Sequence, residues 1–293
     1  MEKAIQNFVC IGAQKAGTTT LADILSLHPD ICIPEIKETK FFLFDDEYKN
    51  GLEYYTKTYF SSYKNQNAVG EFDPDYLLFP FTAERIYKTL GKEIKLIVVL
   101  RNPADRAYSH YLMTKRKGLE PLSFTEAIEK ESSRKNSIKE QKIFAYLERG
   151  FYGAQLQEFL KYFPKENFLF LLFEEDIIRN RENTISTVQK FLHVNVEALN
   201  TNIHSNEAGE FKSEAVTNLV RKPNFAKKIF KKILPSTSVR KNLRKFFLKK
   251  NMKAVSSPRL DEQLKKEIIN KHFKEDILLT QKLTGKNLSI WLQ

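Results

Sequence analysis

Residues 8–27 read FVCIGAQKAGTTTLADILSL, and this stretch decides the fold. Its first six residues, FVCIGA, form an apolar run typical of a buried parallel strand. Residues 18–27 have a helical pattern, which His28-Pro29 ends. A strand that leads through a glycine-containing loop into a helix directs backbone N–H groups and the helix dipole at an anion. The stretch therefore predicts a phosphate-binding loop in an α/β protein.

The alternation of strands and helices continues along the chain. Apolar runs predict further strands at 31–34, 68–72, 94–100 and 167–176. Helical patterns are found at 104–116, 124–133, 144–162, 183–193 and 259–284, and the aromatic residues 41–63 are expected to form helix and loop over the sheet. Such alternation predicts βαβ units and a central parallel β-sheet flanked by helices. We expect a single domain over residues 1–293, with a core over about 5–200 and a helical part over about 201–293.

The composition excludes several classes of protein. Hydrophobic residues make up 42% of the 293 residues and charged residues 29%, which is a globular rather than a disordered balance. No apolar stretch approaches the roughly 18 residues of a membrane helix, and the N-terminal segment lacks the pattern of a signal peptide. Two cysteines, Cys10 and Cys32, form neither a disulfide scaffold nor a multi-cysteine zinc site. We therefore expect a cytoplasmic protein.

The formal net charge of +12 is concentrated in residues 221–253, which we call the basic limb. The limb holds 13 Lys or Arg and no acidic residue, whereas the rest of the chain has 35 basic and 36 acidic residues. Its apolar residues recur at helical spacing, so we expect a helical basic extension. Such a helix either packs its apolar side on the domain or binds an anionic membrane or polymer. Cutting the chain before residue 221 would separate these two interpretations.

The predicted phosphate loop differs from that of nucleoside triphosphatases. Gly12 and Gly17 keep the spacing of G-x-x-x-x-G-K-[ST], but Thr18 stands at the lysine position and the loop's lysine is Lys15. The clearest strand, IKLIVVL at 94–100, runs into Arg101 and not into an Asp that could hold magnesium. Both departures favour a shorter anion over a magnesium-bound triphosphate, and we expect no metal.

The chain resembles the sulfotransferases that use 3′-phosphoadenosine 5′-phosphosulfate (PAPS), and within them the carbohydrate branch with the heparan sulfate enzymes and bacterial relatives. The resemblance spans about residues 8–193 and rests on five segments. These are IGAQKAGTTTLADILSLHPDI (11–31), EIKETKFFLFDDEYKNGLEYYTKTYF (35–60), GEFDPDYL (70–77), LIVVLRNPADRAYSHYL (96–112) and RGFYGAQLQEFLKYFPKENFLFLLFEED (149–176). The C-terminal third matches only loosely.

The resemblance implies a PAPS site. Arg101 and Ser109 match the family's 3′-phosphate segment, and an Arg at the carboxyl end of a strand also suits phosphate on chemical grounds. Tyr152 and Lys212 are further candidates for contact with the nucleotide, although Tyr152 is as well explained as a packed tyrosine. The 5′-phosphosulfate is expected at the loop, on Lys15, Ala16, Gly17, Thr18, Thr19 and Thr20.

The resemblance also implies the catalytic pair for an in-line sulfuryl transfer. Lys15 is expected to stabilise the leaving group, and Glu38, just before Phe41-Phe42, is the expected base. The alternative for Glu38 is a structural ion pair with Lys37 or Lys40. Lys40 stands where several relatives carry His, so it is expected either to hold Glu38 ionised or to bind an acidic acceptor.

Asp73, Asp75 and Tyr76 are expected to line the acceptor cleft together with Lys40. The expected reaction is transfer from PAPS to a hydroxyl or an amine of a carbohydrate or glycolipid acceptor. A P-loop nucleotide kinase or NTPase is the alternative enzyme. The alternative from another class is a basic module that binds an anionic membrane or polyanion through the limb. Nucleic acid is not an expected partner.

Overall fold

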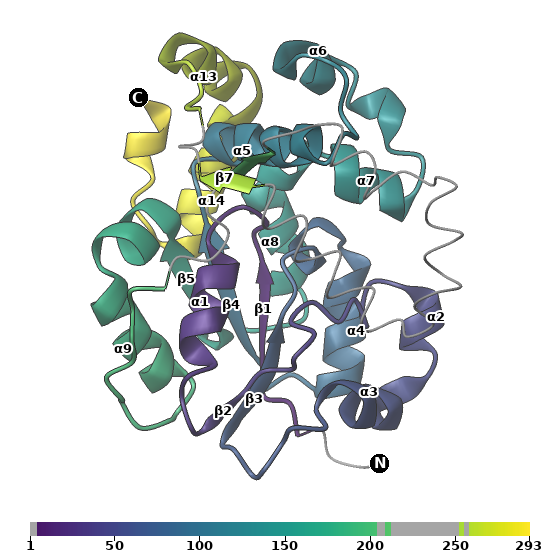
Figure 1. Cartoon of the computed structure of the whole chain (residues 1–293), viewed down its shortest axis with the longest axis vertical. Helices are drawn as coiled ribbons and strands as arrows, with labels where there is room; N and C mark the ends of the chain where they lie inside the picture. The colour runs from purple at the N-terminus through teal and green to yellow at the C-terminus, as the bar shows by residue number, and fades with distance from the viewer. Residues whose placement is uncertain (1–4, 204–208, 212–251, 255–257) are drawn as a thin grey trace. The chain divides into compact units, whose positions relative to one another are not determined.

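The computed structural model describes residues 5–203, 209–211, 252–254 and 258–293 (Figure 1). The contacts divide the chain into two units, residues 1–205 with 260–293 and residues 206–259. In the second unit the structure describes an antiparallel pair, β6 (Gly209–Phe211) and β7 (Met252–Ala254). The helices expected for the basic limb lie outside the described residues, as does Lys212, and the single-domain organisation stays a prediction.

The first unit is built on a five-stranded sheet in the order β2-β3-β1-β4-β5, and every pair of neighbours is parallel. Its central strands are apolar along their length and buried on both faces, as parallel strands covered by helices must be. The expected α/β fold is thereby confirmed. The strands are β1 (Phe8–Gly12), β2 (Ile31–Cys32), β3 (Ala68–Phe72), β4 (Lys95–Leu100) and β5 (Phe168–Leu172).

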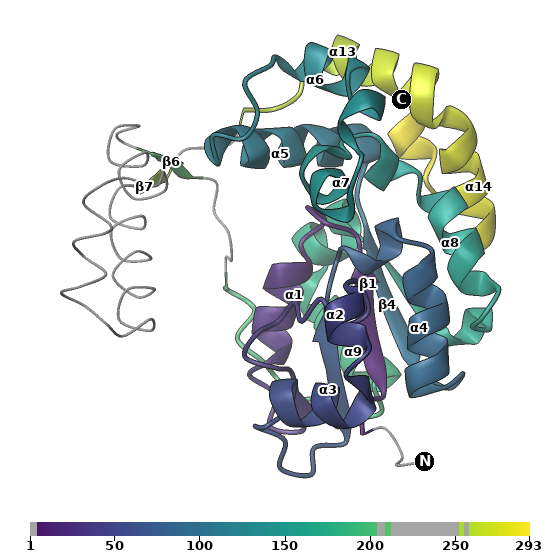
Figure 2. The ribbon, with the colours of Figure 1, turned by 90° about the vertical axis from the view of Figure 1, so that its right-hand side faces the viewer.

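Helices cover both faces of this sheet. Figure 2 shows α1 (Thr18–Leu25) on one side and α4 (Phe81–Leu90) and α8 (Tyr152–Leu160) on the other. Helix α9 (Arg181–Phe191) packs against α1, and α14 (Lys274–Thr284) packs against α8. The remaining helices are α2 (Asp45–Tyr48), α3 (Gly51–Tyr59), α5 (Pro103–Arg116), α6 (Phe124–Glu129), α7 (Ile138–Phe144) and α13 (Glu262–Ile268).

Three expected elements differ from the structure. The helix expected over 144–162 is interrupted, because Gly150 lies against the ring of Phe273 in a short 3₁₀ turn, Glu148–Gly150, before α8 begins. Strand β5 ends at Leu172 and not at 176, since a π-helical segment, Phe173–Arg179, follows it. Strand β2 has two residues only. Helices α4 and α7 occupy stretches to which the sequence analysis assigns no element.

The C-terminal segment returns to the sheet domain and completes it. Asp276 on α14 accepts hydrogen bonds from the backbone N–H groups of Gly153 and Ala154, both at 2.9 Å, and so caps the start of α8. The helical pattern expected at 259–284 is confirmed as α13, a π-helical turn at Ile269–Phe273, and α14. Among the described residues, no helix is both long and apolar enough to cross a membrane.

Candidate active site

The loop from β1 to α1 turns through two residues with left-handed backbone. Lys15 has a φ angle of 73° and Gly17, the N-cap of α1, has a φ angle of 88°. Because glycine has no side chain to offer, the first N–H groups of α1 receive no cap from it. Free N–H groups at a helix start, together with the helix dipole, make an anion-binding position. The sequence predicts phosphate binding at this same point, over residues 16–20.

Lys15 lies in this loop among other cations. Its pKa is lowered to about 8, first by burial and then by the positive charges of Arg116, Arg101, Lys117 and Arg106. In the ranges that the structure describes, neither Lys15 nor Arg101 takes part in an ion pair. A buried ammonium group crowded by cations is destabilised, and a negative charge nearby would relieve that repulsion. The electrostatics of the loop therefore suit an anion.

Arg101 follows β4 and holds the loop from the neighbouring strand. Its guanidinium group donates to the backbone carbonyl of Lys15 at 3.1 Å and stacks on the ring of Phe173, 4.7 Å from the ring centroid. Its Nε is buried without a hydrogen-bond partner. Buried N–H groups are normally paired, so this donor is free to bind a ligand. Phe173 also lies against Gly17, where a Cβ atom would come within 3.0 Å of its ring.

The other expected donor-site residues differ in their surroundings. Ser109 lies half-buried on α5, two helical turns after Arg101. Tyr152 is buried, and its hydroxyl donates to the backbone carbonyl of Arg101 at 2.9 Å, so it supports the end of β4. Thr19 accepts a hydrogen bond from Lys37 Nζ at 3.1 Å. Ala16 and Thr18 are buried in the loop, whereas Thr20 is half-buried.

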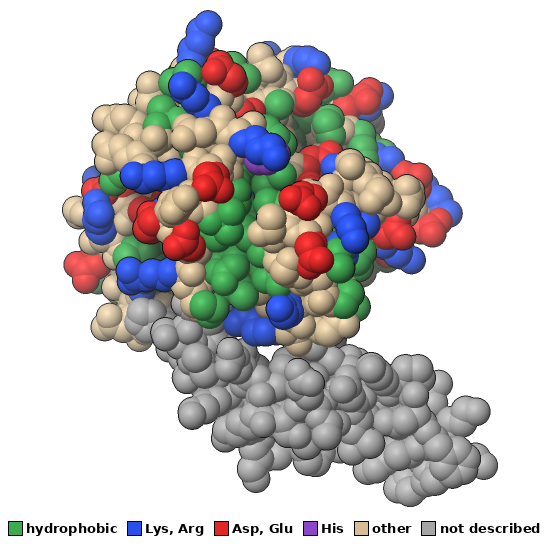
Figure 3. All heavy atoms as spheres, turned by 90° about the horizontal axis from the view of Figure 1, so that it is seen from above, with side chains coloured by type: hydrophobic (Ala, Val, Ile, Leu, Met, Phe, Trp, Pro, Cys, Tyr) green, Lys and Arg blue, Asp and Glu red, His purple; other side chains and the backbone are tan. Residues whose placement is uncertain are grey.

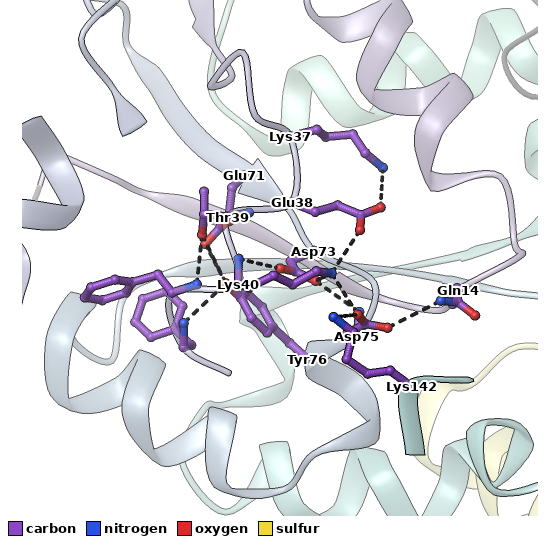
Figure 4. A network of polar contacts seen from close by, with 12 residues as sticks. Gln14, Lys37, Glu38, Thr39, Lys40, Glu71, Asp73, Asp75, Tyr76 and Lys142 are labelled. Atoms are coloured by element: carbon purple, nitrogen blue, oxygen red, sulfur yellow. Dashed lines mark hydrogen bonds and ion pairs between the residues drawn. The ribbon is translucent and has the colours of Figure 1, made fainter. Parts of the chain in front are cut away.

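The loops after β2 and β3 form the second half of the site (Figure 4). Lys40 Nζ lies 2.9 Å from Glu38 Oε2, 2.7 Å from Asp73 Oδ1 and 2.7 Å from Asp75 Oδ2. Lys37 Nζ contacts the other oxygen of Glu38 at 3.5 Å. The structure thus brings together all of these sequence-predicted residues, and it forms both of the ion pairs considered for Glu38.

Glu38 is held in its ionised form. Burial alone would raise its pKa, but the ammonium groups of Lys40 and Lys37 outweigh burial and place the pKa below its ordinary value. Its side chain is 41% exposed, whereas the side chains of Asp73 and Asp75 are 0% and 2% exposed. Glu38 is therefore the carboxylate of this group that faces solvent and can receive a proton.

A buried layer lies beneath these charges. Glu71 in β3 accepts hydrogen bonds from the hydroxyls of Tyr55 at 2.6 Å and Tyr76 at 3.1 Å. Burial, and next the charge of Asp73, raise the pKa of Glu71 to about 7. Tyr76 is fully buried, so it supports the cleft from below instead of presenting its hydroxyl to solvent. Glu71 was no sequence candidate, although a carboxylate in the apolar run AVGEF is an unusual feature.

Three more side chains that sequence reasoning missed converge on Asp75. Arg149 pairs with it at 2.8 Å, Lys142 at 3.2 Å, and Gln14 donates to it at 3.4 Å. Burial opposes the ionised form of Asp75, but Arg149, Lys40 and Lys142 together hold its pKa far below the ordinary value. The signal available for Arg149 was its place in the segment RGFY, next to the candidate Tyr152.

Arg106 and His110 are buried residues of α5. Both side chains are fully buried; Arg106 donates to the carbonyl of Tyr146, while its Nε and Nη1 and both ring nitrogens of His110 lack partners. Burial and next the charges of Arg149 and Arg106 hold the pKa of His110 well below its ordinary value. His110 is thus a neutral buried ring, and Arg106 adds positive charge from behind the site.

The family comparison agrees with this geometry. The model of the sulfotransferase domain family matches residues 6–275. The chain is 39% identical over 127 residues to the membrane-associated sulfotransferase kil1 of Dictyostelium discoideum. This match covers 41% of this chain and 26% of kil1. It is 30% identical over 207 residues to heparan sulfate glucosamine 3-O-sulfotransferase 5 of Mus musculus. This match covers 69% of this chain and 58% of the mouse protein. The chain thus spans between about a quarter and somewhat over half of these relatives.

One solved structure shares nearly the whole architecture. The chain matches the sulfotransferase from Alicyclobacillus acidocaldarius with a TM-score of 0.69 and 27% sequence identity. The match covers 98% of this chain and 99% of the bacterial one. The parallel sheet with its C-terminal helices is therefore an arrangement that the two chains have in common.

Proposed function

Because the chain belongs to the sulfotransferase domain family, we propose that it transfers a sulfuryl group from PAPS to a hydroxyl or amine of a carbohydrate or glycolipid. The family expected from the sequence is confirmed; the donor, the acceptor and the residue roles are the proposal. The observation that carries it is the hydrogen bond from Arg101 to the backbone of Lys15 in the loop before α1, with a buried, unpartnered donor left on Arg101.

PAPS offers two anionic groups to this pocket. The 5′-phosphosulfate is bound by the N–H groups at residues 16–20 and by the Lys15 ammonium. The 3′-phosphate is bound by Arg101, which follows β4, and by Ser109 on α5. The lowered pKa of Lys15 and the unpartnered Nε of Arg101 support this assignment, because both groups gain from a bound anion. Lys212 stays a candidate for nucleotide contact.

The two catalytic residues act on opposite sides of the transferred group. PAPS supplies an activated sulfuryl group, whose transfer spreads negative charge over oxygen atoms much as phosphoryl transfer does. Lys15 stabilises the charge that develops on the leaving oxygen as the S–O bond breaks. Glu38 accepts the proton of the acceptor hydroxyl or amine as the new bond to sulfur forms. Both residues lie on loops at the carboxyl edge of the sheet.

A carbohydrate acceptor is favoured by the relatives whose names specify one, the heparan sulfate glucosamine 3-O-sulfotransferases. Figure 3 views the described residues from above, where acidic and basic side chains are intermixed around apolar ones. Around Glu38 the lysines are paired with carboxylates, so neutral glycans and glycolipids belong in an acceptor screen beside polyanionic ones.

The kinase or NTPase alternative predicts binding of a magnesium-bound triphosphate. The loop has no lysine at the required position, and β4 runs into Arg101. The carboxylate oxygens of Glu38, Asp73 and Asp75 lie within 4.8 Å of one another, but the Lys40 ammonium already contacts all three. Lys37, Lys142 and Arg149 add the positive charge that balances the rest. These observations favour PAPS, and the absence of a metal from the reaction stays a prediction.

A transfer assay with radiolabelled PAPS tests the proposal. The acceptors are heparan sulfate, its desulfated form, a neutral oligosaccharide and a glycolipid. We expect label on at least one of them, and a loss of at least about 100-fold in kcat for Glu38→Gln and Lys15→Met. The control is Lys161→Met, which removes an exposed ion pair with Glu158 on the far end of α8. Equal rates for all four proteins would contradict the assigned roles.

Peripheral membrane association is a second proposal, carried by the basic limb. The limb has 13 basic residues and no acidic one, and a relative is named membrane-associated. Such segments bind anionic lipid surfaces electrostatically. Sedimentation with vesicles containing phosphatidylserine, compared with neutral vesicles, should show binding that salt abolishes. Replacing the limb's Lys and Arg by Gln in the full chain should remove this binding and leave transfer intact.

A further inference from the structure

Lys40 has no free donor for a substrate. An ammonium group has three hydrogens, and Lys40 Nζ has three carboxylate partners, Asp73 at 2.7 Å, Asp75 at 2.7 Å and Glu38 at 2.9 Å. Figure 4 shows its side chain pointing into this group of oxygens. The sequence left two roles open for Lys40, and this geometry favours the one in which it acts on Glu38.

The backbone of Lys40 is fixed together with its side chain. Its φ angle is 61°, in the left-handed region that residues with a Cβ atom rarely adopt. The backbone N–H donates to Asp73 Oδ2 at 3.0 Å, while Asp73 Oδ1 binds the ammonium of the same residue. Asp73 is itself tied to the sheet, because its N–H donates to the carbonyl of Cys10 in β1 at 2.9 Å. The ammonium group is thus anchored to two strands.

The three carboxylate partners of Lys40 differ in their other charged neighbours and in their exposure to solvent. Asp75 is shared with Arg149 on the turn before α8 and with Lys142 on α7. Asp73 is completely buried, and the carboxyl groups of Asp75 and of Glu71 in β3 lie near it. Glu38 alone among the partners reaches solvent, and on its own loop it has one further cation, Lys37.

We propose that Lys40 is a positioning residue whose ammonium group, anchored by Asp73 and Asp75, orients Glu38 and keeps it ionised for the acceptor. This inference rests on the proposed function, in which Glu38 is the base. During transfer the acceptor proton moves to Glu38 as the bond to sulfur forms and the bond to the leaving oxygen breaks. Glu38 afterwards releases the proton to water, and Lys40 stays protonated throughout. Asp73 and Asp75 act through Lys40 and do not contact the acceptor.

The protonation of Glu38 can be followed directly by NMR. In protein labelled with [5-¹³C]glutamate, the Glu38 carboxyl signal is the one lost in Glu38→Gln. We expect its midpoint below the ordinary 4.5 in the unsubstituted protein. In Lys40→Gln and Lys40→Met the midpoint should rise by at least about one pH unit, a tenfold change in proton affinity. An unchanged midpoint in these folded variants would overturn the proposal.

Lys37→Met is the matched control, because it removes the weaker cation from the same carboxylate. Its contact with Glu38 is 3.5 Å against 2.9 Å for Lys40, so we expect a smaller rise of the midpoint. A larger rise than in Lys40→Gln would transfer the role to Lys37 and contradict the proposal. If neither neutral variant folds, the side-chain ¹⁵N signal of Lys40 is compared with that in Glu38→Gln. A shift supports the ion pair, and its absence contradicts the proposal.

Titration with adenosine 3′,5′-bisphosphate separates this inference from the proposed function. Lys40 lies on the acceptor side, so Lys40→Gln should bind the bisphosphate as the unsubstituted protein does. Failure of the unsubstituted protein to bind it would reject the proposed donor, while the carboxyl titration would still judge the action of Lys40 on Glu38.

Discussion

At the scale of single residues, the charge of Lys15 depends on whether an anion is bound. Its ammonium is surrounded by positive charge and its pKa is lowered to about 8. A bound bisphosphate supplies negative charge and raises this pKa, so above pH 8 binding must be accompanied by proton uptake. The affinity should therefore fall as the pH rises through 8, because Lys15 then loses its proton in the free protein.

Calorimetry at pH 8.5 in two buffers of different ionisation enthalpy measures this uptake. The apparent binding enthalpy should differ between the buffers for the unsubstituted protein. In Lys15→Arg the difference should vanish, because arginine stays protonated at this pH. Identical enthalpies in both buffers for the unsubstituted protein would show that Lys15 does not sense the ligand.

Glu71 gives a second prediction at this scale, on stability. Its pKa of about 7 lies above the ordinary 4.5, so the folded state binds a proton that the unfolded state releases between these values. The contribution of Glu71 to stability is therefore present at low pH and lost as the pH rises toward 7. Between pH 5 and 8, the unsubstituted protein should lose about 2 kcal/mol relative to Glu71→Gln. Urea unfolding of both proteins at several pH values measures this difference in the free energy of unfolding. A difference that does not change with pH would contradict the prediction.

Part of the site could be predicted at the residue scale. Lys15, Glu38 and Arg101 lie in short motifs, so the sequence alone indicates their place at the carboxyl ends of strands. Arg149, Lys142 and Gln14 could not be assigned, because they meet Asp75 from three separate segments. Their role depends on tertiary contacts that no local pattern contains.

At the scale of elements, the closeness of β1 and β3 depends on Gly70. Gly70 pairs with Phe8, and a Cβ atom at residue 70 would overlap the carbonyl oxygen of Phe8. Gly70→Ala should therefore force the two strands apart and lower the free energy of unfolding by about 3 kcal/mol. Denaturant unfolding measures the loss.

Gly118→Ala is the control for Gly70→Ala. Gly118 has a φ angle of 69°, but a Cβ atom there meets no neighbour within 4 Å. Its cost should be limited to backbone strain of about 1–2 kcal/mol. If both variants lose the same free energy of unfolding, the close packing of β1 and β3 does not explain the glycine at residue 70.

The strands were more predictable than the helices. Runs such as IKLIVVL are apolar at all but one position, Lys95, and a buried parallel strand favours such a nearly continuous apolar run. Helix α7 lies in the charged stretch KNSIKEQKIF, which has no clear apolar period and begins at the N-cap Ser137. The end of β5 was misplaced because Asp176 turns back and accepts from the N–H of Leu172 at 2.6 Å. That contact is invisible to a count of apolar residues.

At the scale of the whole molecule, residues 260–293 belong to the same unit as the sheet. The cut before residue 221 considered from the sequence would remove α14, and with it the cap on α8 and the contact of Phe273 with Gly150. The basic limb is therefore better examined by charge substitution in the full chain than by truncation.

Substitution of Asp276 tests how much the packing of residues 260–293 on the sheet domain contributes to stability. Asp276→Ala leaves the N–H groups of Gly153 and Ala154 without their acceptor, and Gly153 is buried. We expect a loss of about 2–3 kcal/mol in the free energy of unfolding. Asp261→Ala removes the exposed N-cap of α13 and should cost about 1 kcal/mol. Equal losses would mean that the C-terminal segment is a loosely attached extension.

We propose above that Lys15 and Arg101 form a site for PAPS. The most direct test of this proposal is calorimetric titration of the full chain with adenosine 3′,5′-bisphosphate, beside MgATP. We expect tight bisphosphate binding, clearly weaker ATP binding, and a loss of at least about tenfold in bisphosphate affinity for Arg101→Ala. Arg179→Ala, which removes an exposed ion pair with Glu175, should bind normally. If well-folded protein does not bind the bisphosphate, or binds MgATP more tightly, Lys15 and Arg101 do not form a PAPS site.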